Sequence, residues 1–556
     1  MNGTRFAIIT DTHIRVPGGD LSSPFPVNEK ANPRAVFAVG MIAAAKPDFT
    51  IHLGDVIHPL PHMPSAVEAA VEAERILAPL KPDLHFVPGN HDIGDKPSDL
   101  MPAGPVDQAS IAVYEKRVGP QFHAFRHRDV HLVCMNSSLV NTGSEPEKIQ
   151  RDWLEQELRG SDAAVKLLFS HYPPFICTAD EADHYDNYGE PGRSWLLNLA
   201  AETGVRSIFS GHVHHFFYNR YRDVQLYCLP ATSFTRQDYA ELFPISPANE
   251  FGRDDLGKFG VTIIEASEQG VDVTVHNTVG AEGAFTGPPP SPPKAQDVIP
   301  HLRHAWHVPK ALPYNGPMEE FSRKLSRNDY PLLRLMQLGI DTVRVPAADL
   351  LDPAARGRIE DWIALGHKIL PFWAGSAADD VIRACEELRD SMPAVEVLVR
   401  KPEPGCLRGW GDLPIWLSKI STSADDPDPA QTFAHAVGSG VFPERTADLA
   451  KVAAEAGAAG IVMQIAWERD LAAAVRLGQA AVESTDLLLI LNLCLRLADP
   501  AKSNFDQAAI DKRIATARDL AAADCRIVLQ IDTFEDVDRG YGPRFGLIDR
   551  LSNLRP

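Results

Sequence analysis

The sequence is poor in cysteine and has no long apolar run. Its seven cysteines are scattered over 556 residues without a C-x-x-C pair, which argues against a disulfide framework and against a thiolate zinc site. No stretch reaches 18 consecutive apolar residues, and the amino terminus lacks the charged and apolar regions of a signal peptide. We therefore expect a reduced, cytoplasmic protein that does not associate with a membrane.

Basic residues are scarce relative to acidic ones. The chain has 54 lysines and arginines against 74 aspartates and glutamates, a formal net charge of −20. Proteins that bind long phosphate backbones without sequence preference need a cationic surface, so polymeric nucleic acid is not expected as a partner. A small phosphate ester remains open as a substrate, because bound divalent cations can dominate the field inside a site.

The length of the chain predicts two domains. Residues 280–294 are rich in glycine and proline, and proline cannot continue a helix or a central strand. This segment is typical of a stiff, extended connector. We expect a first domain over residues 1–280, a linker over 281–300 and a second domain over 301–556.

Five short segments rich in histidine, aspartate and asparagine lie in one order across the first 214 residues. Each follows a short apolar run of the kind that forms buried strands, so the polar residues would lie where strands end. Carboxylate, amide and imidazole groups suit Mn, Fe, Co or Zn at hydrolytic centres. The segments are Asp11-Thr-His13, Gly54-Asp55, Gly89-Asn90-His91-Asp92, His171 and Gly211-His212-Val213-His214.

This ordered set resembles the calcineurin-like metallophosphoesterase superfamily over about residues 1–280. The resemblance implies a four-layer αββα sandwich that holds two divalent or trivalent metal ions, drawn from Mn, Fe, Zn or Co. It assigns Asp11, His13 and His214 to one ion. It assigns Asn90, His171 and His212 to the other, with Asp55 bridging the two.

Such a metal pair can clamp the attacking and leaving oxygens of an in-line displacement and can supply hydroxide as the nucleophile at neutral pH. In the family that the chain resembles, the histidine that matches His91 faces the substrate. We expect His91 to act as a general acid. Asp92 could orient the His91 imidazole or could cap a helix, and the sequence leaves both roles open.

The motifs also bear on the substrate. The segment Gly54-Asp55-Val-Ile-His58 lacks the arginine found in phosphoprotein phosphatases of the superfamily, and the third motif ends in Asp92 instead of Glu. The chain looks more like the branch with cyclic-nucleotide and glycerophosphodiester phosphodiesterases, so a small phosphodiester is the first expectation. A phosphomonoesterase for a nucleotide or sugar phosphate is the alternative, and a non-catalytic binding protein that retains the fold is another.

The polar and aromatic segment after His171 is a candidate for substrate recognition, since recognition residues often lie on loops of a rigid scaffold. An acidic, solvated surface loop is the alternative interpretation. The candidate substrate contacts are Tyr172, His184, Tyr185 and Tyr188.

The second half of the sequence alternates apolar strand patterns with helical ones, which predicts a second α/β domain, a (β/α)8 barrel. Polar residues lie at several predicted strand ends, where barrels bind ligands, but they match no known motif. They could form a second active site, although a binding or dimerisation role is favoured, and the chain could form a homo-oligomer. The predicted strands cover 303–308, 341–345, 368–373, 395–399, 414–420, 460–465, 487–493 and 526–531. The polar residues are Arg344, Lys401, Glu403, Gln464, Glu468, Asn492 and Asp532.

Overall fold

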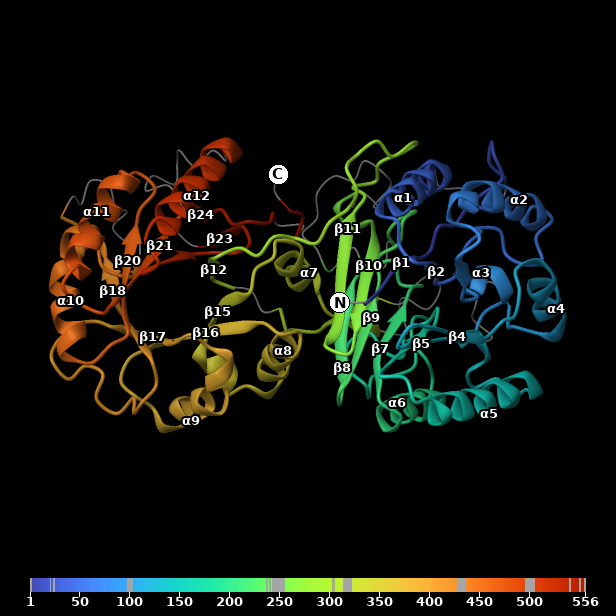
Figure 1. Cartoon of the computed structure of the whole chain (residues 1–556), viewed down its shortest axis with the longest axis horizontal. Helices are drawn as coiled ribbons and strands as arrows, with labels where there is room; N and C mark the ends of the chain where they lie inside the picture. Colours follow the sequence, from blue (N-terminus) through green and yellow to red (C-terminus); the bar gives the residue numbers. More distant parts are fainter. Residues whose placement is uncertain are drawn as a thin grey trace. The chain divides into compact units, whose positions relative to one another are not determined.

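The chain separates into two compact units, which are drawn in Figure 1. The first unit comprises Met1–Pro292 and Pro309–Leu333, and the second comprises Pro293–Val308 and Arg334–Pro556. The computed structural model describes residues 3–20, 22–23, 26–97, 104–236, 239, 242, 256–302, 306–313, 323–427, 437–495, 506–539, 542–549 and 552–554.

Two β-sheets form the centre of the first unit (Figure 1). The first sheet has the order β11-β10-β1-β2-β3, and its strands are β1 (Thr4–Ile9), β2 (Thr50–His52), β3 (Leu84–Phe86), β10 (Gly260–Ser267) and β11 (Gly270–Asn277). The second sheet has the order β4-β5-β6-β7-β9-β8, and its strands are β4 (His123–His127), β5 (Val130–Cys134), β6 (Val165–Phe169), β7 (Val205–Ser210), β8 (Phe217–Tyr221) and β9 (Val224–Cys228). In each sheet the strands that precede the predicted metal ligands run parallel to one another.

Helices cover the outer face of each sheet. The helices of the first unit are α1 (Ala31–Ala45), α2 (Ala66–Leu77), α3 (Asn90–Ile93), α4 (Gln108–Arg117), α5 (Glu145–Gly160) and α6 (Gly192–Glu202). Of these, α1 and α2 pack on the first sheet, and α5 and α6 pack on the second. The start of α5 follows from its sequence, because the Ser144 hydroxyl accepts from the Glu147 N–H and Pro146 occupies the first turn. Helix α1 ends where Lys46 adopts a left-handed conformation with φ of 50°.

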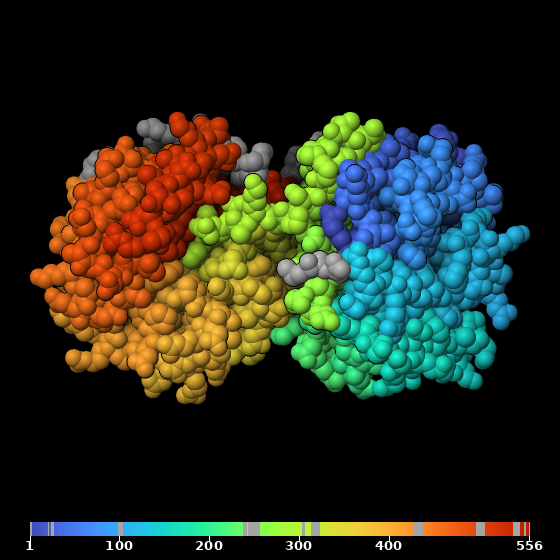
Figure 2. Space-filling model, in the orientation of Figure 1, coloured from blue at the N-terminus to red at the C-terminus, as the bar shows by residue number. Residues whose placement is uncertain are grey.

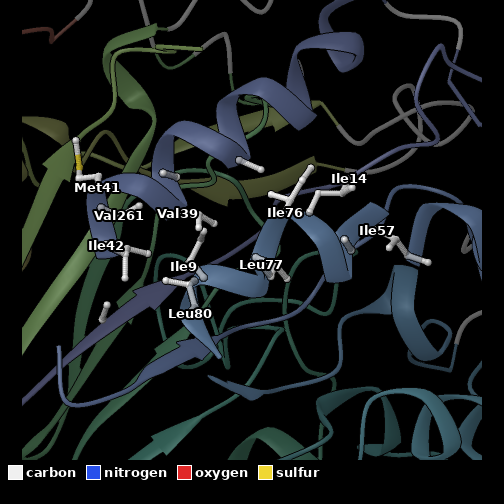
Figure 3. Close-up of a cluster of buried hydrophobic side chains, with 14 of the residues drawn as sticks. Ile9, Ile14, Val39, Met41, Ile42, Ile57, Ile76, Leu77, Leu80 and Val261 are labelled. Atoms are coloured by element: carbon white, nitrogen blue, oxygen red, sulfur yellow. The ribbon is translucent and has the colours of Figure 1, made fainter. Parts of the chain in front are cut away.

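The alternation of side chains along β1 explains the layers. Ile9 points to one face and joins a buried cluster with Ile42 of α1 and Leu77 of α2 (Figure 3). Phe6 points to the other face, and its ring lies edge-on to Phe169 of β6, with the ring centroids 6.0 Å apart. The two sheets therefore pack face to face. Because α5 and α6 cover the far side of the second sheet, the αββα sandwich implied by the family resemblance is confirmed.

Residues 309–333 pack with the first unit, although the sequence places them after the predicted linker and we expected them in the second domain. Here β13 (Lys310–Pro313) pairs antiparallel with β14 (Arg323–Ser326). The Arg327 guanidinium forms an ion pair with Asp329 at 2.6 Å and donates to Asn219 Oδ1 of β8 at 2.9 Å. Since buried charges are stable only when they are paired, these contacts fasten the segment to the first unit.

The second unit contains a parallel, barrel-like sheet of eight strands. Their order is β12-β22-β21-β20-β18-β17-β16-β15, and the ends of this order meet where the Leu302 N–H donates to the Arg344 carbonyl at 2.9 Å. The strands are β12 (Val298–Pro300), β15 (Thr342–Pro346), β16 (Lys368–Ala374), β17 (Val395–Val399), β18 (Ile415–Thr422), β20 (Gly460–Ile465), β21 (Leu488–Leu493) and β22 (Ile527–Ile531). A short strand, β19 (Val437–Ser439), pairs with the end of β18.

Helices lie on the outside of this barrel (Figure 1). They are α7 (Tyr330–Gln337), whose first half belongs to the first unit, α8 (Pro353–Ala364), α9 (Asp379–Glu387), α10 (Thr446–Glu455), α11 (Leu471–Val482) and α12 (Gln507–Ala522). A small hairpin follows, made of β23 (Val537–Arg539) and β24 (Gly542–Arg544). Within the described ranges, no helix has both the length and the apolar character needed to cross a bilayer.

The barrel confirms the predicted fold class, and seven of its strands overlap the predicted ones. The first strand was predicted wrongly over 303–308. Residues 303–305 lie outside the described residues, and Trp306–Val308 contains no strand. The first strand is β12 instead, which lies inside the expected linker and pairs with β22 through Ile299. Residues 286–295 are mostly exposed, without regular structure, and the light green segment that contains them reaches the surface in Figure 2.

We predict that Ile42→Ala destabilises the first unit by about 2–5 kcal/mol, because the Ile42 side chain is fully buried between α1 and the first sheet. Val67→Ala in α2 is the matched control. The Val67 side chain is 62% exposed, and its truncation should change stability by no more than about 0.5 kcal/mol. Urea denaturation of both variants measures the two changes, and equal losses would contradict this description of the core.

Candidate metal centre

The predicted ligands lie at the carboxyl ends of parallel strands. Asp11 and His13 follow β1, Asp55 follows β2, and Asn90 follows β3. In the second sheet, His171 follows β6, and the pair His212 and His214 follows β7. Because the two sheets pack face to face, these strand ends bring all seven side chains to one place, and each is at most 3% exposed.

The backbone is strained at most of these positions. Five of the seven candidate ligands have left-handed φ angles between 43° and 67°, namely Asp11, His13, Asp55, His212 and His214. Non-glycine residues rarely adopt this conformation, and each such residue costs about 1–3 kcal/mol. Strain of this kind concentrates at functional sites, where the surrounding fold holds it in place.

Two glycines allow the loops that carry Asp55 and Asn90 to approach each other closely. Gly54 has a φ of 98°, and a Cβ atom placed on it would lie 2.5 Å from the Gly89 nitrogen. A Cβ atom on Gly89 would lie 2.2 Å from the Asp55 nitrogen. Any side chain at either position would therefore push the loop that carries Asp55 away from the loop that carries Asn90.

The first cluster contains Asp11, His13, Asp55 and His214, whose ligand atoms lie within 4.8 Å of one another. The Nε2 atoms of His13 and His214 are 3.0 Å apart. Asp11 Oδ1 lies 3.4 Å from His214 Nε2, and its other oxygen accepts from the His212 N–H at 3.0 Å.

The second cluster contains Asp55, His171 and His212, and Asn90 joins it. Asn90 Oδ1 lies 3.0 Å from His171 Nε2 and 3.1 Å from His212 Nδ1. The two imidazole nitrogens are 3.3 Å apart. The amide oxygen therefore points into the same space as the two ring nitrogens.

Asp55 is common to both clusters. Its Oδ1 atom accepts from the His91 N–H at 2.8 Å. Its Oδ2 atom lies 3.6 Å from His13 Nε2 in the first cluster and 3.4 Å from His171 Nε2 in the second. This position between the two clusters fits the bridging role that the family resemblance implies.

These distances fit metal ions at the centres of the clusters. Two nitrogens each about 2.0–2.1 Å from a metal ion, at angles between 90° and the tetrahedral value, lie about 2.9–3.4 Å apart. The His13 to His214 and His171 to His212 nitrogen separations of 3.0 and 3.3 Å fall in this range. Two imidazoles cannot both donate across such a gap, and a cation placed between them would satisfy both lone pairs.

Hydrogen bonds fix which ring nitrogen of each histidine faces the cluster. His171 Nδ1 donates to the Leu53 carbonyl at 2.8 Å, and His214 Nδ1 donates to the Phe234 carbonyl at 2.7 Å. The Nε2 atom of each ring is then the free acceptor. Such partners orient metal ligands and set their tautomers.

Burial and neighbouring charges set the protonation of the site. Burial alone raises the pKa of Asp55, but the imidazoles of His171, His91 and His13 outweigh it and hold that pKa well below its ordinary value. Burial lowers the pKa of His212 to about 3. An ionised carboxylate beside a neutral imidazole is the form of both groups that binds a metal.

The sequence analysis did not identify Asp186, a fully buried residue behind His212. Asp186 Oδ1 lies 3.5 Å from His212 Nε2, on the side of the ring opposite to Asn90. The Asp186 carboxylate also pairs with Arg236 and Lys324 and accepts from the Tyr239 hydroxyl at 2.7 Å. This cluster holds His212 in place and brings two cations, Arg236 and Lys324, to the side of the ring that faces Asp186.

His91 and Asp92 have separate surroundings. The His91 Nδ1 atom donates to the His58 carbonyl, and the half-buried His91 ring packs edge-on to His13, with the ring centroids 4.7 Å apart. Asp92 does not orient the His91 ring. Its carboxylate accepts from the N–H groups of Gly89 at 2.9 Å and Val56 at 3.1 Å, which is the helix-cap alternative.

His58 lies close to the centre of the site, although it belongs to none of the five ligand segments of the sequence. Its Nδ1 atom is 3.2 Å from His13 Nδ1, and nitrogens of His13, His58 and His91 lie within 4.8 Å of one another. His58 therefore contacts the imidazole of His13, one of the candidate metal ligands. No local pattern distinguishes it from the other histidines of the chain.

The four candidate substrate contacts separate into two groups. Tyr172, His184 and Tyr188 are buried: Tyr172 donates to Asp95 Oδ1 at 2.5 Å, His184 pairs with Glu181 at 3.1 Å, and Tyr188 belongs to the core of the second sheet. These three have structural roles. Tyr185 is half-buried, and its ring centroid lies 4.8 Å from that of His212, so its substrate contact stays a prediction.

Comparisons with known proteins agree with this geometry. Residues 4–216 match the family model described as calcineurin-like phosphoesterase. The chain is 29% identical over 189 residues to the serine/threonine-protein phosphatase CPPED1 of Bos taurus, covering 33% of this chain and 58% of that protein. The corresponding protein of Danio rerio is 29% identical over 177 residues, covering 30% of this chain and 54% of that protein.

The chain therefore spans little more than half the length of these curated relatives. Among solved structures, a purple acid phosphatase from yellow lupin aligns with a TM-score of 0.35 and 15% identity, over 51% of this chain and 52% of the other. The family uses a dinuclear metal centre, and the two clusters around Asp55 supply candidate ligands for both ions. Residues 4–216 are therefore similar to the calcineurin-like phosphoesterase family, and they contain all seven candidate ligands.

Proposed function

We propose that the first unit is a dinuclear metal-dependent hydrolase of phosphate esters. The observation that carries this proposal is the pair of ligand clusters that share Asp55, with imidazole nitrogens 3.0 and 3.3 Å apart. A binding protein that only retains the fold would be free to lose ligands. All seven expected side chains are present and converge.

The donor set supports Mn, Fe, Zn or Co as the bound ions, because it contains imidazole, carboxylate and amide groups and no thiolate. When bound, such a pair supplies Lewis acidity and an activated water. Asp11, His13 and His214 would hold one ion, and Asn90, His171 and His212 the other. Asp55 would contribute a carboxylate to both sites.

His91 is the proposed general acid. Because its Nδ1–H is held by the His58 carbonyl, the Nε2 atom is the one left to give a proton to a departing alkoxide. The edge-on contact with His13 keeps the ring beside the first cluster. Asp92 has no part in this step, since its carboxylate is occupied by two backbone N–H groups.

For the ester class, we propose a phosphate monoester, which reverses the ranking that the motifs alone give. Two observations support this choice. The curated relatives are named serine/threonine-protein phosphatases, and two cations, Arg236 and Lys324, meet the Asp186 carboxylate beside His212. A monoester dianion has one more negative charge than a diester, so it gains more from that field.

A small phosphodiester is the second candidate. It is favoured by the two motif departures, which are the absence of an arginine after Gly54-Asp55 and the presence of Asp92 at the end of the third motif. The same ligand clusters serve either ester. The two candidates differ in what a direct comparison of model substrates would show.

Asp55→Asn should lower both metal content and turnover, because the bridging carboxylate belongs to both clusters. We expect bound metal to fall from about two ions per chain to fewer than one. Asp107→Asn is the matched control, because Asp107 caps α4 at an exposed position and asparagine caps equally well. Elemental analysis of both variants measures the change, and full metal retention in Asp55→Asn would contradict the shared-ligand geometry.

His91→Ala should keep both ions and slow the chemical step by about 10²–10⁴-fold, the usual contribution of a general acid. His62→Ala, at an exposed position of the loop that also carries His58, should leave both quantities unchanged. Metal content and single-turnover rates are measured together. Metal loss in His91→Ala equal to that in Asp55→Asn would make His91 a ligand instead of an acid.

With Mn²⁺ present, nitrophenyl phosphate should be hydrolysed with a kcat/KM at least about tenfold above that of bis-nitrophenyl phosphate, a difference of about 1.4 kcal/mol in transition-state binding. Arg236→Met should reduce this preference because it removes one positive charge beside His212, whereas Arg75→Met on the exposed face of α2 should not. A preference of the wild type for the diester would restore the small-phosphodiester interpretation.

A further inference from the structure

The interior of the barrel in the second unit is built in layers. Because side chains alternate along a strand, one set of alternate residues from each strand points inward. The layer nearer the amino ends of the strands is apolar and forms one buried cluster. Its members are Ile299, Leu370, Ala394, Trp416, Val462 and Ile490, with Leu488 and Val528 packed against them.

The next inward positions, toward the carboxyl ends of the strands, are almost all polar. Gln530 of β22 donates to Glu396 of β17 at 3.3 Å, and these strands are not neighbours, so the contact crosses the interior. The inward residues of this layer are His301, Arg344, Phe372, Glu396, Ser418, Gln464, Asn492 and Gln530, one from each strand or its end. All except Phe372 are buried.

The charges of this layer cancel. Arg344 Nε pairs with Glu396 Oε2 at 2.5 Å, and Arg344 Nη1 donates to His301 Nδ1 at 2.9 Å, which requires a neutral imidazole. Ser439 of β19 donates to Glu396 Oε1 at 2.6 Å. With both of its oxygens occupied, Glu396 offers no carboxylate for acid–base cleavage of a ligand.

Two acceptors of this layer have no hydrogen-bond partner among the described residues. They are Asn492 Oδ1 and Gln530 Oε1, and these side chains are 2% and 0% exposed. Their orientation is fixed, because Asn492 Nδ2 donates to the Ser439 carbonyl at 2.9 Å and Gln530 Nε2 donates to Glu396. The two residues lie opposite each other on β21 and β22, so both oxygens belong to one part of the interior.

Buried acceptors without partners are unfavourable unless a donor reaches them. The missing partner must bring O–H or N–H groups. It must also be uncharged, because a buried ion would face a layer whose own charges already cancel. The carboxyl ends of the strands are, in addition, the face where parallel barrels bind their ligands.

We propose that this layer of the second unit is a binding site for a small uncharged polyhydroxy molecule, such as a sugar or a polyol. Hydroxyl groups would donate to Asn492 Oδ1 and Gln530 Oε1. The half-buried Phe372 ring already carries the Arg344 guanidinium, 3.9 Å from its centroid, so that cation is held by stacking and does not need an anionic ligand. The site is independent of the metal centre and of the function proposed for it.

Titration calorimetry of the full chain with D-glucose and with myo-inositol tests this site. These probes carry no phosphate, so binding at the metal centre does not imitate the result. We expect saturable binding of at least one probe with a Kd below about 10 mM. Asn492→Leu should weaken that binding at least tenfold, because it removes the Oδ1 acceptor at nearly constant volume.

Gln479→Met, which removes an amide from the outer helix α11, is the matched control and should bind as the wild type does. If Asn492→Leu does not fold, crystals of the wild type soaked with the bound probe decide the matter. Density for hydroxyls at Asn492 Oδ1 and Gln530 Oε1 would support the site. The proposal would be overturned if neither probe bound saturably or if Asn492→Leu bound as tightly as the wild type. It would also be overturned if the crystals showed only water at these atoms.

Discussion

The structure of the first unit depends on one buried carboxylate. Asp55 is ionised although it is almost completely buried, and a charge in such a place is stable only with compensating partners. One oxygen is fixed by the His91 N–H, and the other lies between His13 and His171. Every ligand loop must therefore reach this carboxylate, from two different sheets and from strand ends distant in sequence.

The backbone shows how the fold meets this constraint. Five candidate ligands adopt left-handed conformations, and such strain persists only when surrounding structure over-determines it. Here that structure is the buried strands immediately before the ligands, whose apolar side chains fix each strand end. Ile9 on one face and Phe6 on the other anchor β1 between the helical layer and the second sheet. The rigid packing of the strands thus compensates for the unfavourable backbone conformations of the loops that follow them.

The sequence pointed to the seven candidate ligands because each segment combined two signals, an apolar run and a chemically distinctive residue directly after it. It predicted seven barrel strands for the same reason. It did not identify Asp186, because no local sequence pattern indicates which distant residues will contact each other. The partners Arg236 and Lys324 lie 50 and 138 residues away from Asp186 along the chain. The burial of His184 and Tyr188 could not be predicted either. Polar and aromatic residues in a loop form the same sequence pattern whether they are buried or exposed.

Both units use the carboxyl ends of parallel strands, but they solve the burial of polar groups differently. In the first unit, nitrogens and oxygens face one another at distances that fit a shared cation. In the barrel, Arg344, Glu396, Ser439 and Gln530 satisfy one another directly and leave two acceptors over. The converging lone pairs of the first unit suit a positive ion. The neutral network of the barrel, with its two unpaired acceptors, suits a ligand that donates hydrogen bonds. The kind of ligand at each strand-end site therefore follows from which polar atoms remain after the protein has paired its own.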